Sequence, residues 1–232
     1  MKRWQSHTLH ERRTVSASIK LVVGLGNPGR EYEQTRHNAG FWWLEALARE
    51  FGATFKKDNK FHGEVAKVGG VWLLKPLTFM NRSGQAVGSL AKFYQIQPEE
   101  ILVAHDEMDL PAGGLKMKIG GAAGSNGVKD IVSHLGTRDF WRLRIGIGHP
   151  REMALKLGGD MSRAEVVDYV LHRPDKPDAL AIEEAMRRAT DAWPLIAGGD
   201  MEAVMLKLHT KEKSAKVARS TADQPVQKKD SL

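Results

Sequence analysis

Side chains suited to acid–base chemistry follow several apolar runs of this chain, at the points where predicted strands end. Asn27 and His37 come after the first run. Asn81 follows a later run, and Asp106 follows a third. An imidazole held by a carboxylate can take a proton from water, and side-chain amides can bind a carbonyl oxygen or a developing oxyanion. This combination favours water-mediated hydrolysis of a carbonyl compound.

Each of these residues also has a purely structural explanation. A lone histidine after a turn is commonly exposed or structural, and Asp106 at a strand end fits an ordinary turn carboxylate. Asn27 fits a turn, and Asn81 or Ser83 fits the N-cap of a helix predicted over residues 82–94. The chemical interpretation depends on shared placement, because neighbouring strand ends converge on one crevice in an α/β sheet.

The first of these turns also matches a nucleotide-binding pattern. Residues 24–29 read GLGNPG, which satisfies G-x-G-x-x-G. That pattern binds a pyrophosphate only when a helix opens on the glycines. Here Pro28 lacks an N–H, and the helical periodicity begins only at Phe41. The acidic residue expected about 20 positions later at a strand end is also missing. The sequence therefore argues against a nucleotide cofactor.

Composition limits the class of protein. The chain has 232 residues, of which 41% are hydrophobic and 27% charged, as in one globular domain with a substantial core. It has no cysteine, so disulfides, thiolate–zinc sites and a cysteine nucleophile are excluded. No apolar run approaches about 18 residues, which argues against a membrane span. Residues 1–18 lack the apolar core of a secretory signal, and we expect a cytoplasmic protein.

Most of the positive charge lies near the two ends of the chain. The net charge is +7, of which residues 1–18 contribute +3 and residues 211–232 another +3. We expect residues 1–18 to be a disordered basic extension, the alternative being an organelle transit peptide, and residues 211–232 to be a disordered polar tail. The single domain over 19–210 is then nearly neutral, so any specific contact with nucleic acid must come from a few placed cations.

Strand and helix patterns alternate along the chain. Together they predict a single α/β domain with a twisted, mostly parallel mixed sheet and helices on both faces. Residues 150–162 are predicted to form a long surface loop. Strands are expected at 19–25, 64–68, 71–75, 101–105, 115–119 and 143–148, and helices at 38–51, 82–94, 127–135, 163–171, 178–196 and 200–208.

Four segments, in the same order and at similar spacing, resemble the bacterial-type peptidyl-tRNA hydrolases. They are residues 24–40 (GLGNPGREYEQTRHNAG), 76–84 (PLTFMNRSG), 105–111 (HDEMDLP) and 142–150 (RLRIGIGHP). The similarity covers about residues 19–208. It implies a single α/β domain, no metal and no cofactor, and hydrolysis of the ester that joins peptide to tRNA. Nothing in the sequence demands more than a monomer, which is the state we expect.

The resemblance also implies roles for individual residues. His37 matches the catalytic base and Asp106 the carboxylate that keeps its imidazole basic. Asn27 matches a residue that distinguishes blocked peptidyl-tRNA from free aminoacyl-tRNA, while Asn81 and Asn126 match substrate-holding amides.

Four further residues match positions that bind the tRNA. Tyr32 and Phe79 correspond to contacts with its 3′ end, and Lys118 and Arg144 to a pair that grips its 5′ phosphate. One position departs from the family pattern, which usually has histidine where this chain has Ser125, in a glycine-rich loop that is one residue shorter.

Two functions of different kinds follow from the resemblance. The first is an esterase that cleaves peptidyl-tRNA, and retention of His37, Asp106 and the two asparagines favours it. The second is a non-enzymatic RNA-binding relative that keeps the fold, and the altered loop favours that alternative. We expect the esterase.

Overall fold

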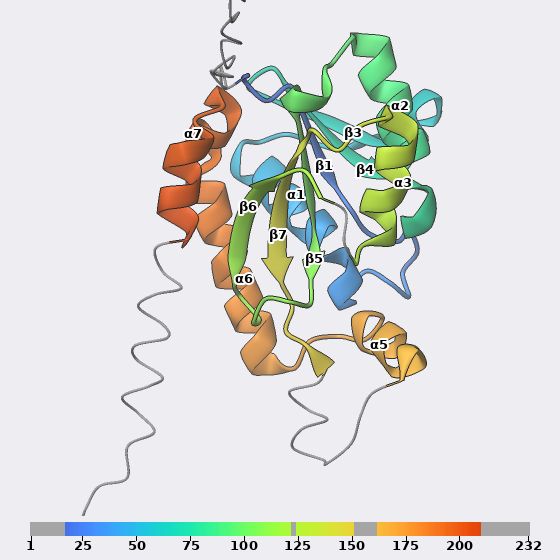
Figure 1. Cartoon of the computed structure of the whole chain (residues 1–232), viewed down its shortest axis with the longest axis vertical. Coiled ribbons are helices and arrows are strands. Elements are labelled where there is room, and N and C mark those ends of the chain that lie inside the picture. The colour runs from blue at the N-terminus through green and yellow to red at the C-terminus, as the bar shows by residue number, and fades with distance from the viewer. Residues whose placement is uncertain (1–16, 122–123, 151–161, 210–232) are drawn as a thin grey trace, which may run out of the picture.

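The computed structural model of the chain describes residues 17–121, 124–150 and 162–209, and within them the strands form one sheet of seven (Figure 1). The order across the sheet is β2-β3-β4-β1-β5-β7-β6. The strands are β1 (Leu21–Gly24), β2 (Lys56–Asp58), β3 (Gly63–Val68), β4 (Val71–Pro76), β5 (Ile101–Glu107), β6 (Leu115–Ile119) and β7 (Trp141–Gly146).

The centre of the sheet is parallel and its edges are antiparallel. Strands β4, β1, β5 and β7 run in one direction, with β1 paired to both β4 and β5. The β3–β4 hairpin and β2 complete one edge, and β6 pairs antiparallel with β7 at the other. All four residues of β1 are buried, which explains its continuous apolar run. The predicted mixed sheet with a parallel core is confirmed.

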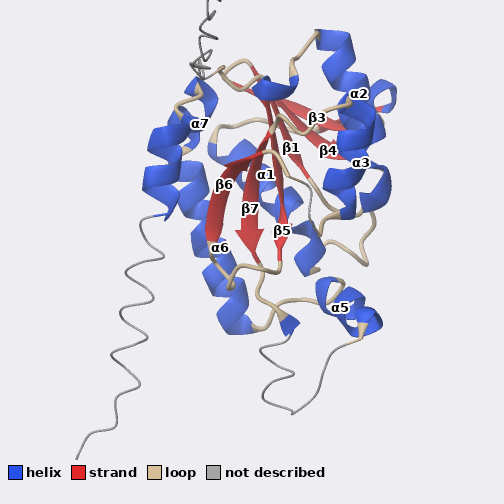
Figure 2. Cartoon of the chain, in the orientation of Figure 1, coloured by secondary structure: helices blue, strands red, loops and turns tan. Residues whose placement is uncertain are grey.

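Helices cover both faces of this sheet (Figure 2), as predicted. On one face lie α1 (Ala39–Glu50), α6 (Lys176–Asp191) and α7 (Trp193–Gly198). On the other lie α2 (Ser83–Tyr94) and α3 (Asn126–Leu135). Along β1 the side chains alternate between the two cores, with Val22 in the first and Leu21 and Val23 in the second. The sheet therefore separates two apolar layers.

Shorter elements complete the described chain. α5 (Arg163–Val170) lies below the carboxyl end of β5 in Figure 1, and residues 201–209 are helical. Four 3-10 turns are η1 (Arg36–Asn38), η2 (Asn59–Phe61), η3 (Met80–Arg82) and η4 (Pro98–Glu100). No helix in these described ranges has the length and apolar character needed to cross a membrane.

Some of the observed elements differ from the predicted ones. The predicted helix 178–196 is two helices, because α6 ends at Asp191 and Pro194 begins a new first turn in α7. Strand β2 was missed because its sequence, KKD, has no apolar residue and is defined only by pairing with β3. The strand predicted at 143–148 begins and ends two residues earlier, as β7. The expected loop at 150–162 falls almost wholly outside the described residues, and the two predicted disordered ends do so in large part.

Candidate active site

His37 and Asp106 form a direct pair at the carboxyl end of the parallel strands. His37 is the middle residue of η1, and Asp106 is the next-to-last residue of β5. The His37 Nδ1 lies 2.9 Å from an Asp106 carboxylate oxygen, and their side chains are 21% and 7% exposed. An ionised carboxylate can only accept a hydrogen bond, so Nδ1 carries the proton and Nε2 is the acceptor. The imidazole is thus oriented as a base.

The surroundings of His37 make its imidazole more basic than usual. Burial lowers the pKa of His37, but the negative charge of Asp106 and its hydrogen bond outweigh this and raise the pKa above its ordinary value. The base and the carboxylate predicted from the sequence are therefore together in space, with the electrostatic relation that a general base needs.

Asn27, in the loop after β1, makes three hydrogen bonds. Its backbone N–H donates to Asn38 Oδ1 at 2.8 Å, and its carbonyl accepts from Asn38 Nδ2 at 3.0 Å. Its side-chain oxygen accepts from the backbone N–H of Met80 at 2.8 Å. That last bond fixes the orientation of the amide, because only the oxygen can accept. The Asn27 NH₂ group makes no hydrogen bond with any described residue and is free to donate.

The segments that carry Asn81 and Asn126 meet beside this loop. Asn81 lies in η3 and is exposed, and its side chain makes no hydrogen bond with a described residue. It does not cap α2, whose N-cap is Arg82, so the capping alternative for Asn81 and Ser83 was wrong. Asn126 is also exposed and is the first residue of α3. The next residue, Gly127, packs closely on Met80, because a Cβ on Gly127 would lie 2.6 Å from the Met80 sulfur.

Ser125 has a defined structural role at the position that departs from the family pattern. It is the N-cap of α3, and its hydroxyl accepts from the backbone N–H of Val128 at 3.3 Å. The hydroxyl therefore stabilises the start of the helix that presents Asn126.

Two aromatic residues predicted to bind substrate lie on loops near these segments. Phe79 precedes η3 and is 58% exposed, so its ring has little packing within the described protein. Tyr32 is half-buried, and its carbonyl accepts from both the backbone N–H and the hydroxyl of Thr35. The Phe79 ring is therefore available for contact with a ligand.

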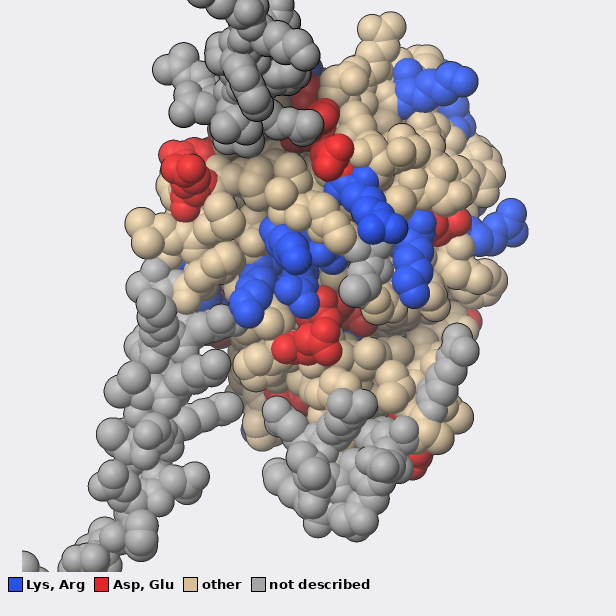
Figure 3. All heavy atoms as spheres, in the orientation of Figure 1, with Lys and Arg blue, Asp and Glu red and all other residues tan. Residues whose placement is uncertain are grey.

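The two predicted phosphate-binding cations are not paired with one another. In the β6–β7 ladder Lys118 lies opposite Arg142, while Arg144 lies opposite Lys116. Residues opposed in this way share a face, so the four cations form one group, in which Arg142 is buried. Figure 3 shows Lys and Arg side chains gathered over β6 and β7. The Nε of Arg144 binds a Glu107 carboxylate oxygen at 2.7 Å, which joins this group to β5.

Sequence reasoning missed two residues that hold the site together. Asn38 is 2% exposed and ties Asn27 to η1, and Arg36 is 5% exposed and binds residues near α5. The signal for both was present, since each directly flanks His37. Their roles depend on which groups lie beside them in the fold. Among the described residues no group of three or more His, Asp or Glu side chains is placed to hold a metal ion.

The fold and these contacts define a class of protein, an α/β domain with an acid–base pair and side-chain amides at the carboxyl ends of its parallel strands. The family model described as peptidyl-tRNA hydrolase matches residues 21–216. The chain belongs to the peptidyl-tRNA hydrolase family.

Individual relatives and a solved structure agree with this assignment. The chain is 54% identical over 201 residues to a peptidyl-tRNA hydrolase of Nitrosospira multiformis, covering 84% of this chain and 100% of the relative. It is 56% identical over 197 residues to one of Cupriavidus pinatubonensis, covering 83% and 98%. The crystal structure of peptidyl-tRNA hydrolase from Acinetobacter baumannii matches with a TM-score of 0.75 at 44% identity, covering 83% of this chain and 95% of that one. The resemblance found in the sequence is confirmed.

Proposed function

We propose that this chain hydrolyses the ester bond between peptide and tRNA, with His37 as the base that activates water. Membership of the family supports the reaction, and the 2.9 Å contact between His37 and Asp106 is the observation that supports the mechanism. Because Nδ1 is directed at the carboxylate, Nε2 is the nitrogen that accepts the proton.

The reaction proceeds in two steps, attack by water and collapse of the tetrahedral intermediate. Nε2 of His37 takes a proton from water as the water oxygen attacks the ester carbonyl carbon, giving a tetrahedral oxyanion. Collapse of this intermediate breaks the bond to the ribose oxygen at the tRNA 3′ end, and the imidazolium returns the proton to that oxygen. Asp106 stabilises the imidazolium between the two steps.

The asparagines supply donors for the carbonyl groups of the substrate. The free NH₂ group of Asn27 can donate to a peptide carbonyl, whereas an unblocked aminoacyl-tRNA presents an ammonium group that donates as well. This mismatch accounts for preference for blocked substrates, because an unpaired buried donor is costly. Asn81 and Asn126, whose segments meet near Met80, hold the rest of the peptidyl group or its oxyanion.

The tRNA is bound by stacking and by placed cations. Tyr32 and Phe79 stack on bases of the single-stranded 3′ end. Lys118 and Arg144 bind the 5′ phosphate, with Glu107 orienting the Arg144 guanidinium. We further propose that the protein acts as a monomer in the cytoplasm, where tRNA is reused, and needs no metal or cofactor.

The test compares an N-acetylated aminoacyl-tRNA with its unblocked counterpart, each incubated with wild type and with His37→Ala, with no metal added. We expect release of tRNA from the blocked substrate only, and a loss of about 10²-fold or more in His37→Ala. Affinity of the variant for tRNA should stay within a few-fold.

A second outcome identifies the alternative function. If wild type binds tRNA tightly but releases nothing from the blocked substrate, the chain is an RNA-binding relative without activity. Wild-type hydrolysis by His37→Ala would instead refute the assignment of the base while leaving the reaction intact.

A further inference from the structure

Arg36, the residue before His37, is a buried cation that binds a distant part of the chain. Its side chain is 6% exposed. Its Nη1 donates to the carbonyl oxygens of His172 at 3.4 Å and Arg173 at 2.6 Å, and its Nη2 lies 3.5 Å from a carboxylate oxygen of Asp178. These partners belong to the connection between α5 and α6 and to the first turn of α6. Arg36 therefore joins η1 to the C-terminal helices.

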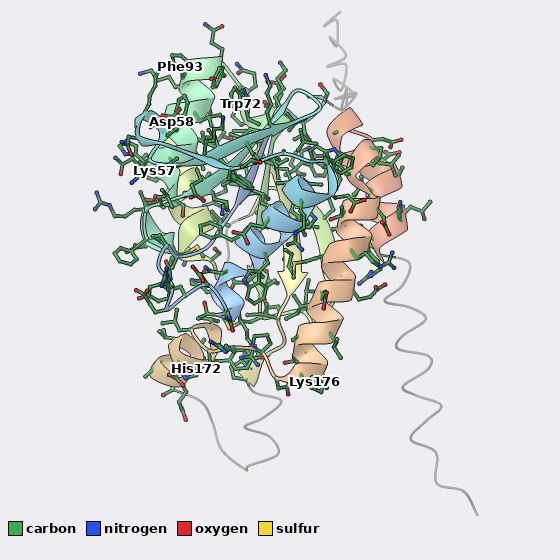
Figure 4. All side chains as sticks on the ribbon, turned by 180° about the vertical axis from the view of Figure 1, so that it is seen from behind. Lys57, Asp58, Trp72, Phe93, His172 and Lys176 are labelled. Atoms are coloured by element: carbon green, nitrogen blue, oxygen red, sulfur yellow. The ribbon has the colours of Figure 1, made fainter. Side chains whose placement is uncertain are left out.

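Arg36 makes two more contacts with this part of the chain. The backbone N–H of Arg36 donates to the His172 carbonyl at 3.0 Å, and the guanidinium carbon lies 4.1 Å from the centre of the Tyr169 ring. The Tyr169 hydroxyl donates to the carbonyl of Ile147, just after β7, at 2.8 Å. The last turn of α5 is thus bound to the residue that follows β7, and the connection, marked by His172 in Figure 4, is bound to η1.

His37 lies between two attached residues, Arg36 and Asn38. η1 has three residues, of which the first is bound to the α5–α6 connection and the third, Asn38, is bound to the loop of Asn27. The middle residue carries the imidazole that contacts Asp106. Any rotation of η1 would move the ring relative to the carboxylate, and hydrogen bonds weaken steeply away from their preferred geometry.

We propose that Arg36 is a positioning residue for His37, and that the connection between α5 and α6 is the support through which it acts. The proposal rests on the proposed role of His37 as base. A guanidinium suits this task because its planar fork can bind two carbonyls and a carboxylate at once while stacking on a ring. A lysine ammonium keeps the charge but cannot reproduce that arrangement.

The test is Arg36→Lys, followed by NMR titration of the His37 imidazole and by kcat and KM on N-acetylated aminoacyl-tRNA. Burial and Asp106 are the influences on the pKa of His37 in the described protein, so a displaced ring loses part of the effect of Asp106. We expect the titration midpoint of His37 to fall toward its ordinary value. We also expect kcat to fall about tenfold or more with KM nearly unchanged, because small misplacements of a reacting group are costly.

The control is Arg173→Ala, which removes a positive charge from the same connection but keeps the backbone carbonyl that Arg36 binds. It should leave the titration of His37, kcat and KM as in wild type. An equal loss of kcat in this control would show that local charge, rather than the contact with Arg36, matters, and would overturn the proposal.

The proposal also fails if Arg36→Lys leaves the midpoint of His37 unchanged and lowers kcat only in proportion to the folded fraction. If Arg36→Lys does not fold, Tyr169→Leu takes its place, since it removes the ring beneath the guanidinium. That variant must move the midpoint in the same direction, and an unmoved midpoint contradicts the proposal. The titration needs no substrate, so failure here is distinct from a wild type that hydrolyses nothing.

Discussion

At the scale of single residues, His37 and His105 show how surroundings decide the role of an imidazole. His105 precedes Asp106 in β5 but is 1% exposed. Burial lowers the pKa of His105, and the nearby carboxylates only partly oppose this. Its Nδ1 donates to the backbone carbonyl of Asp106 at 2.7 Å, and Arg142 approaches its other nitrogen. A neutral, buried ring of this kind is structural, so of these two histidines only His37 fits the role of the proposed base.

Arg144 allows a prediction that separates binding from catalysis. Arg144→Ala should raise KM with little change in kcat, because a phosphate contact is made equally in the ground state and the transition state. The slope of log affinity against log salt concentration should decrease by about one. The measurement is the salt dependence of tRNA binding together with steady-state kinetics. Loss of kcat alone would show that Arg144 does not act on the phosphate.

The matched control for Arg144 lies on the far edge of the sheet. Lys57, in β2 and labelled in Figure 4, is an exposed cation on the strand furthest in sheet order from β6. Lys57→Ala should change neither KM nor the salt slope. If both variants weaken binding equally, overall charge rather than the group on β6 and β7 accounts for affinity.

At the scale of elements, the sequence predicted those segments whose apolar pattern agrees with their final environment. The strands at β4 and β6 and the helix α3 lie within one residue of the predicted bounds. Strand β2 could not be predicted, because it is polar and depends on pairing with β3. The division between α6 and α7 was missed because the apolar periodicity continues through Ala192 although Pro194 interrupts the hydrogen bonding.

The close approach of α1 to the sheet gives a prediction at this scale. A Cβ on Gly40, in the first turn of α1, would collide with the carbonyl oxygen of Ala104 in β5 and with the backbone of Leu25. Gly40→Ala should therefore destabilise the protein by about 1–3 kcal/mol or more. It should also lower kcat, because α1 follows directly from η1. Denaturant unfolding and kinetics measure the two effects.

Gly88→Ala is the matched control within a helix. A Cβ on Gly88 in α2 would meet only His134, at an ordinary 3.6 Å. Alanine should therefore stabilise the protein by about 0.5–1 kcal/mol through its higher helix propensity. If Gly40→Ala were equally stabilising, α1 would not be packed against the strands as described.

At the scale of the whole molecule, the site depends on contacts between distant parts of the chain. The pairing of His37 with Asp106 spans 69 residues, and that of Arg36 with Arg173 spans 137. The first was predictable because both residues are chemically distinctive and lie at or just after the carboxyl ends of strands. The second was not, since the partner of Arg36 is a backbone carbonyl, which leaves no mark on the sequence. The resemblance named Asp106 as the support of His37 but was silent on Arg36 and Asn38.

The distribution of charge predicts how the ends of the chain affect binding. A version limited to residues 19–210 loses +6 of the +7 net charge. It should fold and hydrolyse N-acetylated aminoacyl-tRNA with an unchanged kcat, because the site lies wholly within that range. Its affinity for tRNA should fall at low salt and converge with that of the full chain at high salt. A lost kcat would contradict the predicted domain limits.

The central claim is that the charge of Asp106 makes His37 an effective base, and the pH dependence of kcat/KM tests it most directly. A base must be neutral, so kcat/KM in the wild type should rise with pH as His37 loses its proton, with a midpoint above the ordinary value of about 6.5. Asp106→Asn keeps a group that accepts from Nδ1 but removes the charge. For Asp106→Asn we predict a lower midpoint of kcat/KM against pH, because the pKa of His37 falls. We also predict a lower plateau of kcat/KM at high pH, because the Asp106 charge no longer stabilises the imidazolium. An unchanged midpoint in Asp106→Asn would contradict the account.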